Sequence, residues 1–417
     1  MYNTLFWILI LILLLNFIIE RVLEYLNKKN QTTQLPASLE GIYDAEKYAR
    51  SIEYNRTKQD FGLVVSVFNL MIVLTLLFTG GFAAIDLWAA GIAADPLWHT
   101  LLFFGVLAFG ADILNIPFSL YSIFVIEEKY GFNRTTWATF LVDKIKGYFL
   151  MALIGGSILA LFVLFYYWAG VNFWIYLWIA MSIITIIFSM FYASILLPLF
   201  NKLTPLPEGE LRTAIENYSH KVDFKLDNIF VMDGSKRSTK SNAFFTGLGK
   251  RKTIVLFDTL IEKHSIDELV AVLAHEIGHY KKKHTLSNVI ISVLQSGLML
   301  FLLAWAIDNP ALSEALGGSG ANIRLGLLAF GILYTPVSVI IGILMNMLSR
   351  KYEFEADQYA TETYNGNALQ LALKKLSVDN LSNLNPHPAY VFVHYSHPPL
   401  LQRLKAIDEV KEGNYAE

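Results

Sequence analysis

The sequence predicts an all-α polytopic membrane protein with seven transmembrane helices and a small α+β insert on its cytoplasmic side. Of the 417 residues, 54% are hydrophobic and only 16% are charged, whereas charged residues make up roughly a quarter of an ordinary soluble domain. The apolar residues also gather into runs, each about long enough to cross a hydrocarbon core of roughly 30 Å as a helix. Composition and clustering together place the chain in a lipid bilayer.

The charge of the loops gives these spans an orientation. The first run follows Met-Tyr-Asn-Thr with no basic region or small-residue cleavage site, which is typical of a retained anchor. Lys and Arg are frequent between residues 21 and 60 but absent from 85–96, 170–172 and 308–323. Because basic loops stay in the cytoplasm, we expect the N-terminus outside and the C-terminus inside. The predicted spans lie near residues 4–20, 61–84, 97–119, 147–169, 173–198, 286–307 and 324–348.

These spans divide the chain into four parts. Residues 1–198 form a membrane domain with five spans, 199–285 a cytoplasmic insert, 286–348 the sixth and seventh spans, and 349–417 a mostly helical cytoplasmic part. In the insert, Leu211, Ile215 and Tyr218 share one face of a predicted helix. Short strands are predicted over 228–232, 243–248 and 253–257, and the stretch Asn309 to Asn322 is predicted to be an external loop.

Composition also excludes some functions. The net charge of −2 argues against nucleic acid as a partner. The absence of cysteine excludes disulfides, thiolate metal sites and cysteine nucleophiles, so any metal must be held by His, Asp or Glu. Asp112 lies within the third span, where a charged side chain is costly and either pairs with another group or lines a cavity.

The motif His275-Glu276-Ile277-Gly278-His279 predicts a metal site. Ser265 and Glu268 form a capping-box pattern that opens an amphipathic helix around it. Histidines at i and i+4 project from one face, one turn apart, so both imidazoles can reach one tetrahedral ion. The glutamate between them is placed to act on a water bound to that ion. The alternative is an ordinary solvated helix.

A catalytic zinc site uses three protein ligands and an open position for water. The best candidate for the third ligand is Glu353, which directly follows the seventh span and so returns to the membrane face that carries the motif. Asp357, one turn further on, is placed to accept a hydrogen bond from a ligating histidine. Glu355 points elsewhere and is the weaker candidate, and His284 is expected at the membrane surface.

Two further stretches have both an ordinary and a functional interpretation. His397, followed by two prolines and Arg403, is either a structural loop histidine or part of the site, and His387 or His394 could serve in its place. The run from Ser241 to Gly247 is either an ordinary hairpin strand or an exposed edge on which a peptide adds as a further strand.

These motifs together resemble those of the type 1 CAAX prenyl protease family, intramembrane zinc endopeptidases of the gluzincin type. The resemblance covers nearly the whole chain. It rests on the His-Glu motif and on the stretches Glu127 to Asn133, Gly234 to Ser238, Ser241 to Ala243, Leu256 to Leu260, Glu353 to Asp357 and Ser396 to Leu404.

The resemblance implies a cytoplasmic zinc-protease insert below a water-filled chamber enclosed by seven helices. It implies cleavage of the last three residues after a prenylated cysteine, so the partners would be a peptide or protein substrate and the bilayer. One Zn²⁺ would be held by His275, His279 and Glu353, with Glu276 as the catalytic base. Asn242 and Ala243 would lie on the substrate strand, and His397 would stabilise the oxyanion with support from Arg403.

The compartment and two rival functions stay open. Lys240 stands where a histidine often precedes the Ser-Asn-Ala step, and the chain end shows no dilysine retrieval signal, which favours a bacterial plasma membrane over the endoplasmic reticulum of a eukaryote. One rival is a broad membrane quality-control metalloprotease. The other is a non-enzymatic zinc-binding transporter or sensor.

Overall fold

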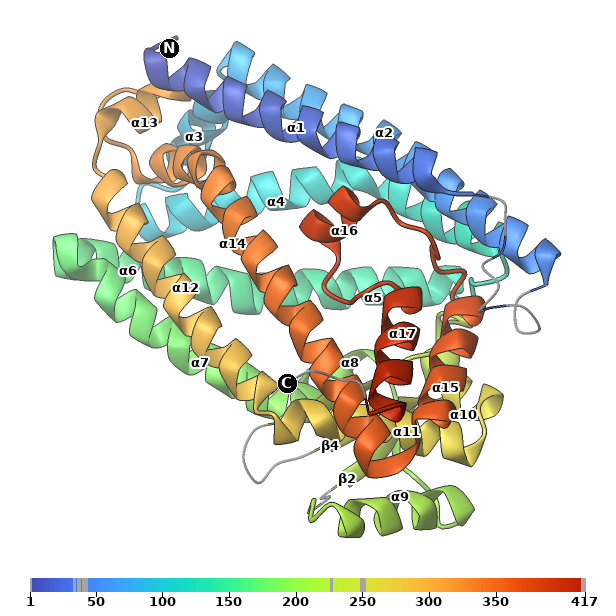
Figure 1. Ribbon diagram of the computed structural model, residues 1–417. Coiled ribbons are helices and arrows are strands. Elements are labelled where there is room, and N and C mark those ends of the chain that lie inside the picture. Colours follow the sequence, from blue (N-terminus) through green and yellow to red (C-terminus); the bar gives the residue numbers. More distant parts are fainter. Residues whose placement is uncertain are drawn as a thin grey trace.

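Long helices dominate the computed structural model, which describes residues 2–413 except 33–34, 36–38, 40–43, 226–227 and 248–252. Figure 1 shows these helices arranged as a ring, with the small sheet and the helices around it gathered at one end. The elements of the membrane part are α1 (Thr4–Asn30), α2 (Ala45–Thr79), α3 (Gly81–Ile92), α4 (Pro96–Tyr121), α5 (Trp137–Leu150), α6 (Gly156–Ala169), α7 (Phe173–Ile195), α12 (His284–Ala306), α13 (Pro310–Ala315) and α14 (Ile323–Ala360).

Six helical runs among the described residues are long and apolar enough to cross a membrane. The run Trp137–Phe200 contains both the fourth and the fifth predicted span, which the 3₁₀ turn Gly170–Asn172 separates and which pack against each other as α6 and α7. The polytopic membrane class is therefore confirmed, whereas the count of seven separate spans is not reproduced as such.

Two predicted boundaries are wrong. The second span was predicted to reach residue 84, but α2 ends at Thr79. Gly80 is the C-cap of this helix and has a left-handed conformation, with φ of 70°. The predicted loop from Asn309 to Asn322 contains α13, whose first turn is capped by the Asn309 side chain and has proline at its first position. Both cases depend on local capping geometry rather than on hydropathy.

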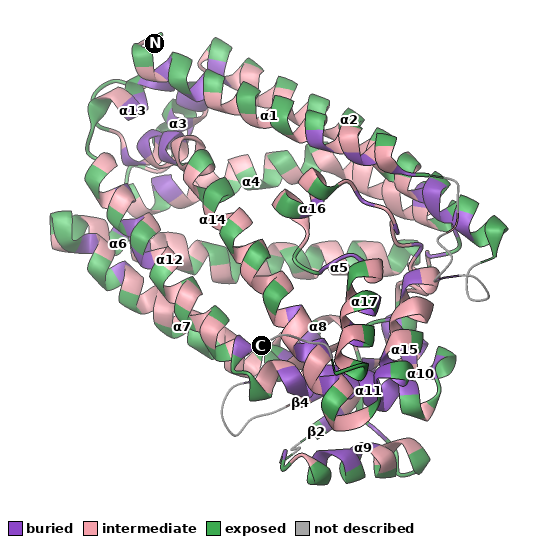
Figure 2. Cartoon of the chain, viewed as in Figure 1, coloured by how far each residue is buried: buried purple, intermediate pink, exposed green. Residues whose placement is uncertain are grey.

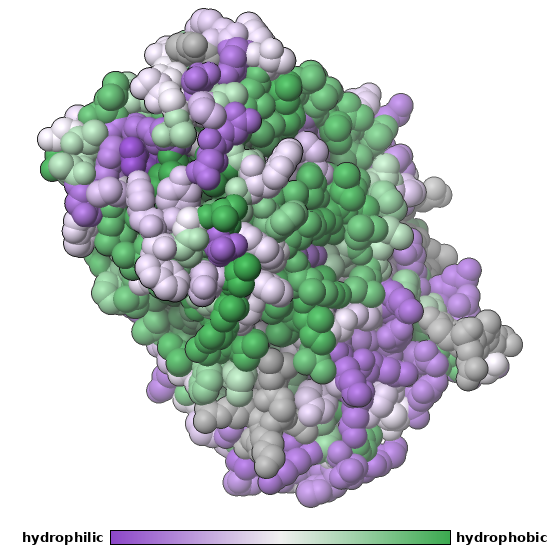
Figure 3. Space-filling model, turned by 90° about the vertical axis from the view of Figure 1, so that its left-hand side faces the viewer, coloured by the Kyte–Doolittle hydropathy of each residue, from purple (hydrophilic) through white to green (hydrophobic). Residues whose placement is uncertain are grey.

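Neighbouring spans contact one another around the ring, but only a small share of the residues in each span is buried. Contacts join α1 to α2 and α14, α4 to α6, α6 to α7, α7 to α12 and α12 to α14. No more than 22% of any apolar window is buried, and buried residues concentrate at the two ends of the ring (Figure 2). A broad hydrophobic band crosses the middle of one face, and hydrophilic residues cover the end that carries the insert (Figure 3). The chamber itself stays a prediction.

The insert holds a four-stranded sheet in the order β1-β2-β4-β3. Its strands are β1 (Leu203–Pro205), β2 (Asn228–Met232), β3 (Ala243–Thr246) and β4 (Thr253–Phe257). The predicted strands 228–232 and 253–257 are confirmed. The predicted strand 243–248 ends at Thr246, and residue 248 lies outside the described residues. Strand β1 was not predicted. Among the described residues β3 pairs only with β4, so it forms an edge of the sheet.

Helices surround this sheet and form the second core of the molecule. They are α8 (Leu197–Phe200), α9 (Glu210–Lys221), α10 (Asp258–Lys263), α11 (Ile266–Lys281), α15 (Gly366–Asp379), α16 (Pro388–His394) and α17 (Leu400–Lys411). On α9, Ile215 and Tyr218 are buried as predicted. The apolar face of α11 fills the centre of this core, so α11 is a rigid platform for the motif.

Candidate metal centre and peptide cleft

The motif lies in α11, which the sequence holds in a fixed position. The predicted capping box is present, with Ser265 and Glu268 bonded to each other's backbone N–H groups. Leu269, Leu273 and Ile277 are fully buried. A Cβ atom on Gly278 would lie 3.1 Å from Cα of Ala356, which is tighter than most Cβ contacts, so the α14 backbone would have to move by a few tenths of an ångström. Glycine at this point therefore lets α11 lie directly against α14.

This close packing brings the three predicted ligands together. One ligand atom from each of His275, His279 and Glu353 lies within 4.8 Å of the other two. The carboxylate oxygens of Glu353 lie 3.5 Å from Nε2 of His275 and 3.3 Å from Nε2 of His279. Glu353 is buried, and its Oε2 atom has no hydrogen-bond partner. Glu353, which follows His279 by 74 positions, thus meets both motif histidines at one point, as the sequence predicted.

The groups behind the two histidines fix which ring nitrogens carry protons. Oδ1 of Asp357 lies 2.8 Å from Nδ1 of His275, so that nitrogen donates to the carboxylate. Nδ1 of His279 lies 3.0 Å from Nδ1 of His284, whose Nε2 lies 2.8 Å from Glu355. His284 donates to Glu355, so its Nδ1 accepts the proton of His279. Each motif histidine therefore presents the lone pair of Nε2.

These two lone pairs face each other. The Nε2 atoms of His275 and His279 are 3.2 Å apart, and the unpartnered oxygen of Glu353 lies beside them. Two acceptor nitrogens and a carboxylate in a buried site repel one another unless a cation lies between them. The arrangement has the donor atoms, the spacing and the outer hydrogen bonds of a metal site. The described residues therefore fit a metal ion.

His284 was predicted at the membrane surface, and this prediction is wrong. Its side chain is buried, with 2% of the residue exposed, and its ring stacks on Tyr352 at 3.9 Å between centroids. Lys283 has φ of 63°, so the chain turns sharply and α12 begins with His284 directed back behind His279. The weaker candidate Glu355 points to His284 and not into the ligand cluster, so neither residue is placed to bind an ion.

Arg403 lies against the carboxylates of this cluster. Its Nε and Nη2 atoms make a bidentate contact with Asp357, at 2.7 and 2.6 Å, and its Nη1 lies 3.4 Å from Glu353. Burial opposes the charge of Arg403, but the carboxylate of Asp357 and the charge of Glu353 raise its pKa above the usual value. A permanent positive charge thus holds Asp357 in place for His275.

Of the three candidate C-terminal histidines, only His397 reaches the site. Its Nε2 lies 3.2 Å from Oε1 of Glu353, while 65% of its side chain stays exposed. Ser396 Oγ lies 2.9 Å from the other ring nitrogen and holds the ring in this direction. By contrast, His387 caps α16 and His394 pairs with Glu20. Position therefore favours His397 over His387 and His394, and its role in the reaction stays a prediction.

A cavity of about 400 Å³ lies between the ligand cluster and the edge strand β3, and Asn242, Ala243, Glu276 and His397 line it. The backbone N–H of Phe245 donates to Oε2 of Glu276 at 3.2 Å. Because Asn242 bonds to β4 through its carbonyl, residues 243 and 245 direct their backbone groups to the open side of the sheet. Glu276 thus lies between an open sheet edge and the metal ligands.

Two other residues that the sequence singled out lie outside this cavity. Asp112 accepts hydrogen bonds from Lys144 and Tyr148, both at 2.6 Å, and also lines a separate cavity of about 520 Å³. Both readings of Asp112 therefore hold. Lys240 contacts Glu127 at 2.9 Å and lies over the ring of Phe132 at 4.3 Å, so it ties the insert to the membrane part.

The whole chain matches known proteins. Residues 24–202 match the family model described as CAAX prenyl protease N-terminal, five membrane helices, and residues 205–411 match Peptidase family M48. The chain belongs to the CAAX prenyl protease 1 family. It is accordingly a membrane metalloprotease, and the non-enzymatic transporter or sensor is set aside.

Relatives of this family from distant organisms are similar over about nine-tenths of their length. CAAX prenyl protease 1 of Saccharomyces cerevisiae is 37% identical over 92% of this chain and 91% of its own length, and the human homologue is 33% identical over 91% and 90%. The crystal structure of S. mikatae Ste24p superposes with a TM-score of 0.92 at 35% identity, covering 98% of this chain and all of that chain.

Proposed function

We propose that this protein is a zinc endopeptidase that cuts prenylated peptides and proteins near their C-terminus, releasing the last three residues after a prenylated cysteine. The observation that carries the proposal is the pair of opposed Nε2 atoms beside Glu353, set next to an open strand edge. An imidazole–imidazole–carboxylate donor set is typical of catalytic zinc in peptidases. The prenylated substrate is inferred from the relatives, which are named CAAX prenyl protease 1.

In this proposal His275, His279 and Glu353 hold one Zn²⁺, which polarises the scissile carbonyl and makes the attacking water more acidic. Asp357 and His284 keep the ligand imidazoles in the required tautomer, and Arg403 holds Asp357. These residues form the binding part of the site. Residues 199–285 and 349–417 act together here, because the motif comes from the first part and the third ligand from the second.

Substrate binding uses the edge of β3. The outward carbonyls of Ala243 and Phe245 accept hydrogen bonds from an extended peptide. In the free protein the N–H groups of these two residues bond to Asn242 Oδ1 and Glu276 Oε2, and the peptide's carbonyls take over these donors when it binds. Main-chain pairing of this kind holds a peptide extended irrespective of its side chains. The scissile bond then lies in the cavity of about 400 Å³ that also contains Glu276 and His397.

Glu276 takes a proton from the attacking water and later delivers it to the leaving amine, so that the peptide bond breaks with no net change in the enzyme. In the free enzyme this carboxylate accepts from the N–H of Phe245, which holds it beside the edge to which the peptide binds. His397 donates to the oxygen of the cleaved carbonyl as negative charge develops there, a contribution worth roughly 10²–10³ in rate where such donors have been removed.

The distribution of basic residues supports an active site on the cytoplasmic face and an N-terminus outside. The membrane would be the plasma membrane in a bacterium and the endoplasmic reticulum in a eukaryote. Since the chain contains no cysteine, a single cysteine at Lys405 can be labelled with an impermeant thiol reagent. Labelling in inside-out vesicles but not in right-side-out vesicles is expected, and the reverse result contradicts this orientation.

The function is tested with two peptides that differ only in a farnesyl group on the cysteine. The purified protein should contain one zinc ion per chain and should release a tripeptide from the farnesylated peptide much faster than from its plain twin. A chelator should abolish release, and added zinc should restore it. Equal cleavage of both peptides would instead favour the quality-control protease, and intact zinc binding without any cleavage would contradict the proposal.

A further inference from the structure

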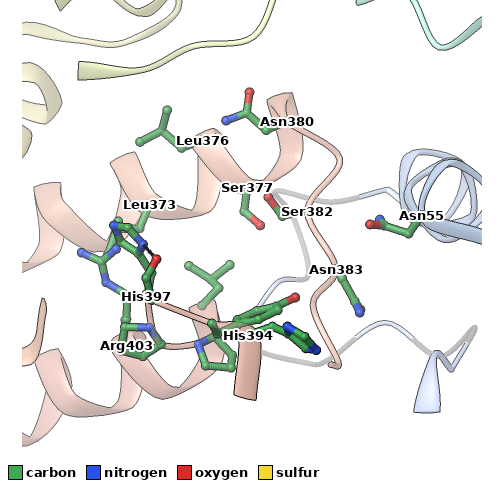
Figure 4. Close-up of a pocket in the computed structure, with 15 residues that line it drawn as sticks. Asn55, Leu373, Leu376, Ser377, Asn380, Ser382, Asn383, His394, His397 and Arg403 are labelled. Atoms are coloured by element: carbon green, nitrogen blue, oxygen red, sulfur yellow. Dashed lines mark hydrogen bonds between the residues drawn. The ribbon is translucent and has the colours of Figure 1, made fainter. Parts of the chain in front are cut away.

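A second cavity, of about 580 Å³, adjoins the cleft. Leu373, Leu376, His397 and Arg403 line both cavities, so the two spaces meet at these side chains. Figure 4 shows His397 and Arg403 on one side of this second cavity, Ser377 and Ser382 directed toward its middle, and Asn55 opposite. Its volume lies within the range of about 300–1,000 Å³ that is usual for ligand sites.

The geometry of β3 gives the direction in which a bound peptide runs. Antiparallel pairing is slightly more stable per residue than parallel pairing, and β3 already pairs antiparallel with β4. A peptide added antiparallel to β3 has its C-terminal side at the N-terminal end of β3. There Ser241 exchanges two hydrogen bonds of 3.3 Å with the side chain of Asn380, and Asn380 lines the second cavity. The chain beyond the scissile bond is thereby directed toward that cavity.

We propose that the second cavity is the binding site for the leaving segment, the three residues that follow the cleaved bond. This inference rests on the proposed function and assigns a place to the part of the substrate that is released. Three extended residues span about 10 Å, so the segment reaches from the cleft past His397 into the space between α15 and the chain that follows α16.

The lining of the cavity suits a short peptide segment that has uncharged side chains and ends in a carboxylate. None of its lining residues is acidic, and Leu373, Leu376 and Leu400 offer apolar walls to aliphatic side chains. The hydroxyls of Ser382 and Tyr395 make no hydrogen bond to any described residue, so both are free to donate to the segment. Burial raises the pKa of Tyr395 to about 12, which keeps its phenol protonated at neutral pH.

The absence of cysteine makes a direct test possible. In a Glu276→Gln background, Ser382→Cys is combined with a farnesylated peptide whose last residue carries a bromoacetyl group. Lys405→Cys is the matched control, because Lys405 lies on α17 near Arg403 with 79% of its side chain exposed to solvent. Alkylation is detected by mass spectrometry of the intact protein.

Alkylation of Cys at position 382 at least tenfold faster than at position 405, suppressed by an excess of unlabelled farnesylated peptide, is the expected result. Equal rates at both positions, or labelling that the unlabelled peptide does not suppress, would overturn the inference. Because no turnover is required, this outcome is separate from the cleavage assay: a wild-type enzyme that cuts the peptide while position 382 stays unlabelled loses the subsite but keeps the proposed function.

A kinetic measurement supplements the crosslink. Tyr395→Phe removes one hydroxyl from the cavity and should raise the KM for the farnesylated peptide about 10-fold to 150-fold, since a hydrogen bond to a charged group is lost. The control Tyr25→Phe removes a hydroxyl from an exposed tyrosine on α1 and should leave KM unchanged. An unchanged KM in Tyr395→Phe would contradict the role of that hydroxyl in holding the leaving segment.

Discussion

Two clusters of buried charge lie at opposite ends of the helical ring, and they differ in one respect (Figures 1 and 2). Remote from the insert, Asp86 on α3 accepts from Asn322 at 2.6 Å and from Arg324 at 2.5 Å, and His99 contacts it at 3.0 Å. At the insert, His275, His279 and Glu353 converge on one another instead. In the first cluster the carboxylate is surrounded by donors, whereas in the second, despite nearby Arg403, three acceptors also face one another.

The difference separates a structural cluster from a site. In the remote cluster no side-chain atom of Asp86, His99, Asn322 or Arg324 is among the buried polar atoms left without a partner in the described residues. Such a cluster is complete and ties α3, α4 and α14 together. In the second cluster Oε2 of Glu353 has no hydrogen-bond partner, only the charge of Arg403 at 3.4 Å, and it lies beside two lone pairs. Burial and charge alone therefore do not identify the functional end of the molecule; the balance of donors and acceptors does.

The strongest test of this comparison is Glu353→Gln. The amide has the same shape but no charge, and it places a donor where an acceptor is needed. Metal affinity should fall by more than about 100-fold, the upper end of the effects seen for groups that only support ligands, and peptide cleavage should be lost with it. Metal content and cleavage are measured on the same sample. The control is Glu362→Gln, two and a half turns further along, which should retain both.

Glu276→Gln separates chemistry from binding within the same cluster. Glu276 is placed beside the ligands and the strand edge but is not among the ligand atoms. Its loss as a base should lower kcat by about 10²–10⁴, while the metal stays at one ion per chain. Wild-type cleavage rates in this variant would remove the proposed base, and loss of the metal would mean that the carboxylate belongs to the ligand set.

Helical spacing in the sequence predicts those contacts of the site whose residues share one helix, and it does not predict contacts between separate helices. His275 and His279, or Glu353 and Asp357, share one face of one helix, so helical spacing alone was enough to pair them. The contact of Arg403 with Asp357 links α17 to α14 and could not be read from spacing. Only the resemblance predicted a role for Arg403, and that role was support of His397. In the structure Arg403 contacts the carboxylates of Asp357 and Glu353 instead.

Local turns explain the remaining failures. The buried place of His284 depends on the left-handed conformation of Lys283, and nothing in the residue type lysine signals such a turn. The edge strand β1 includes Pro205, which lacks a backbone donor and so reads as a loop, yet proline is tolerated at a sheet edge. Strands β2 and β4 were predicted from their short β-type runs and the glycine turns beside them, and the structure pairs them in parallel.

His284→Phe tests whether the outer hydrogen bonds of the metal cluster matter as its geometry indicates. Phenylalanine keeps the stacking on Tyr352 but removes the nitrogen that accepts from His279. Metal affinity, measured by competition with a chelator, should fall about 10–100-fold, and excess zinc should restore cleavage. The control His220→Phe alters an exposed histidine on α9 and should bind metal normally. An unchanged affinity in His284→Phe would show that His279 is held by packing alone.

Asp86→Asn, at the remote cluster, should have the smallest effect on function and a clear effect on stability. It leaves the buried charge of Arg324 without its carboxylate, and breaking a buried pair costs about 3–5 kcal/mol. The free energy of unfolding in detergent should fall by that amount, while metal content and kcat per folded molecule stay unchanged. The matched change Glu53→Gln breaks a pair with Lys129 in which both side chains are 57% exposed, and it should leave the free energy of unfolding almost unchanged, because solvent and salt screen an exposed pair. If Asp86→Asn released the metal as well, the two ends of the ring would be coupled and the division between a structural and a functional cluster would fail.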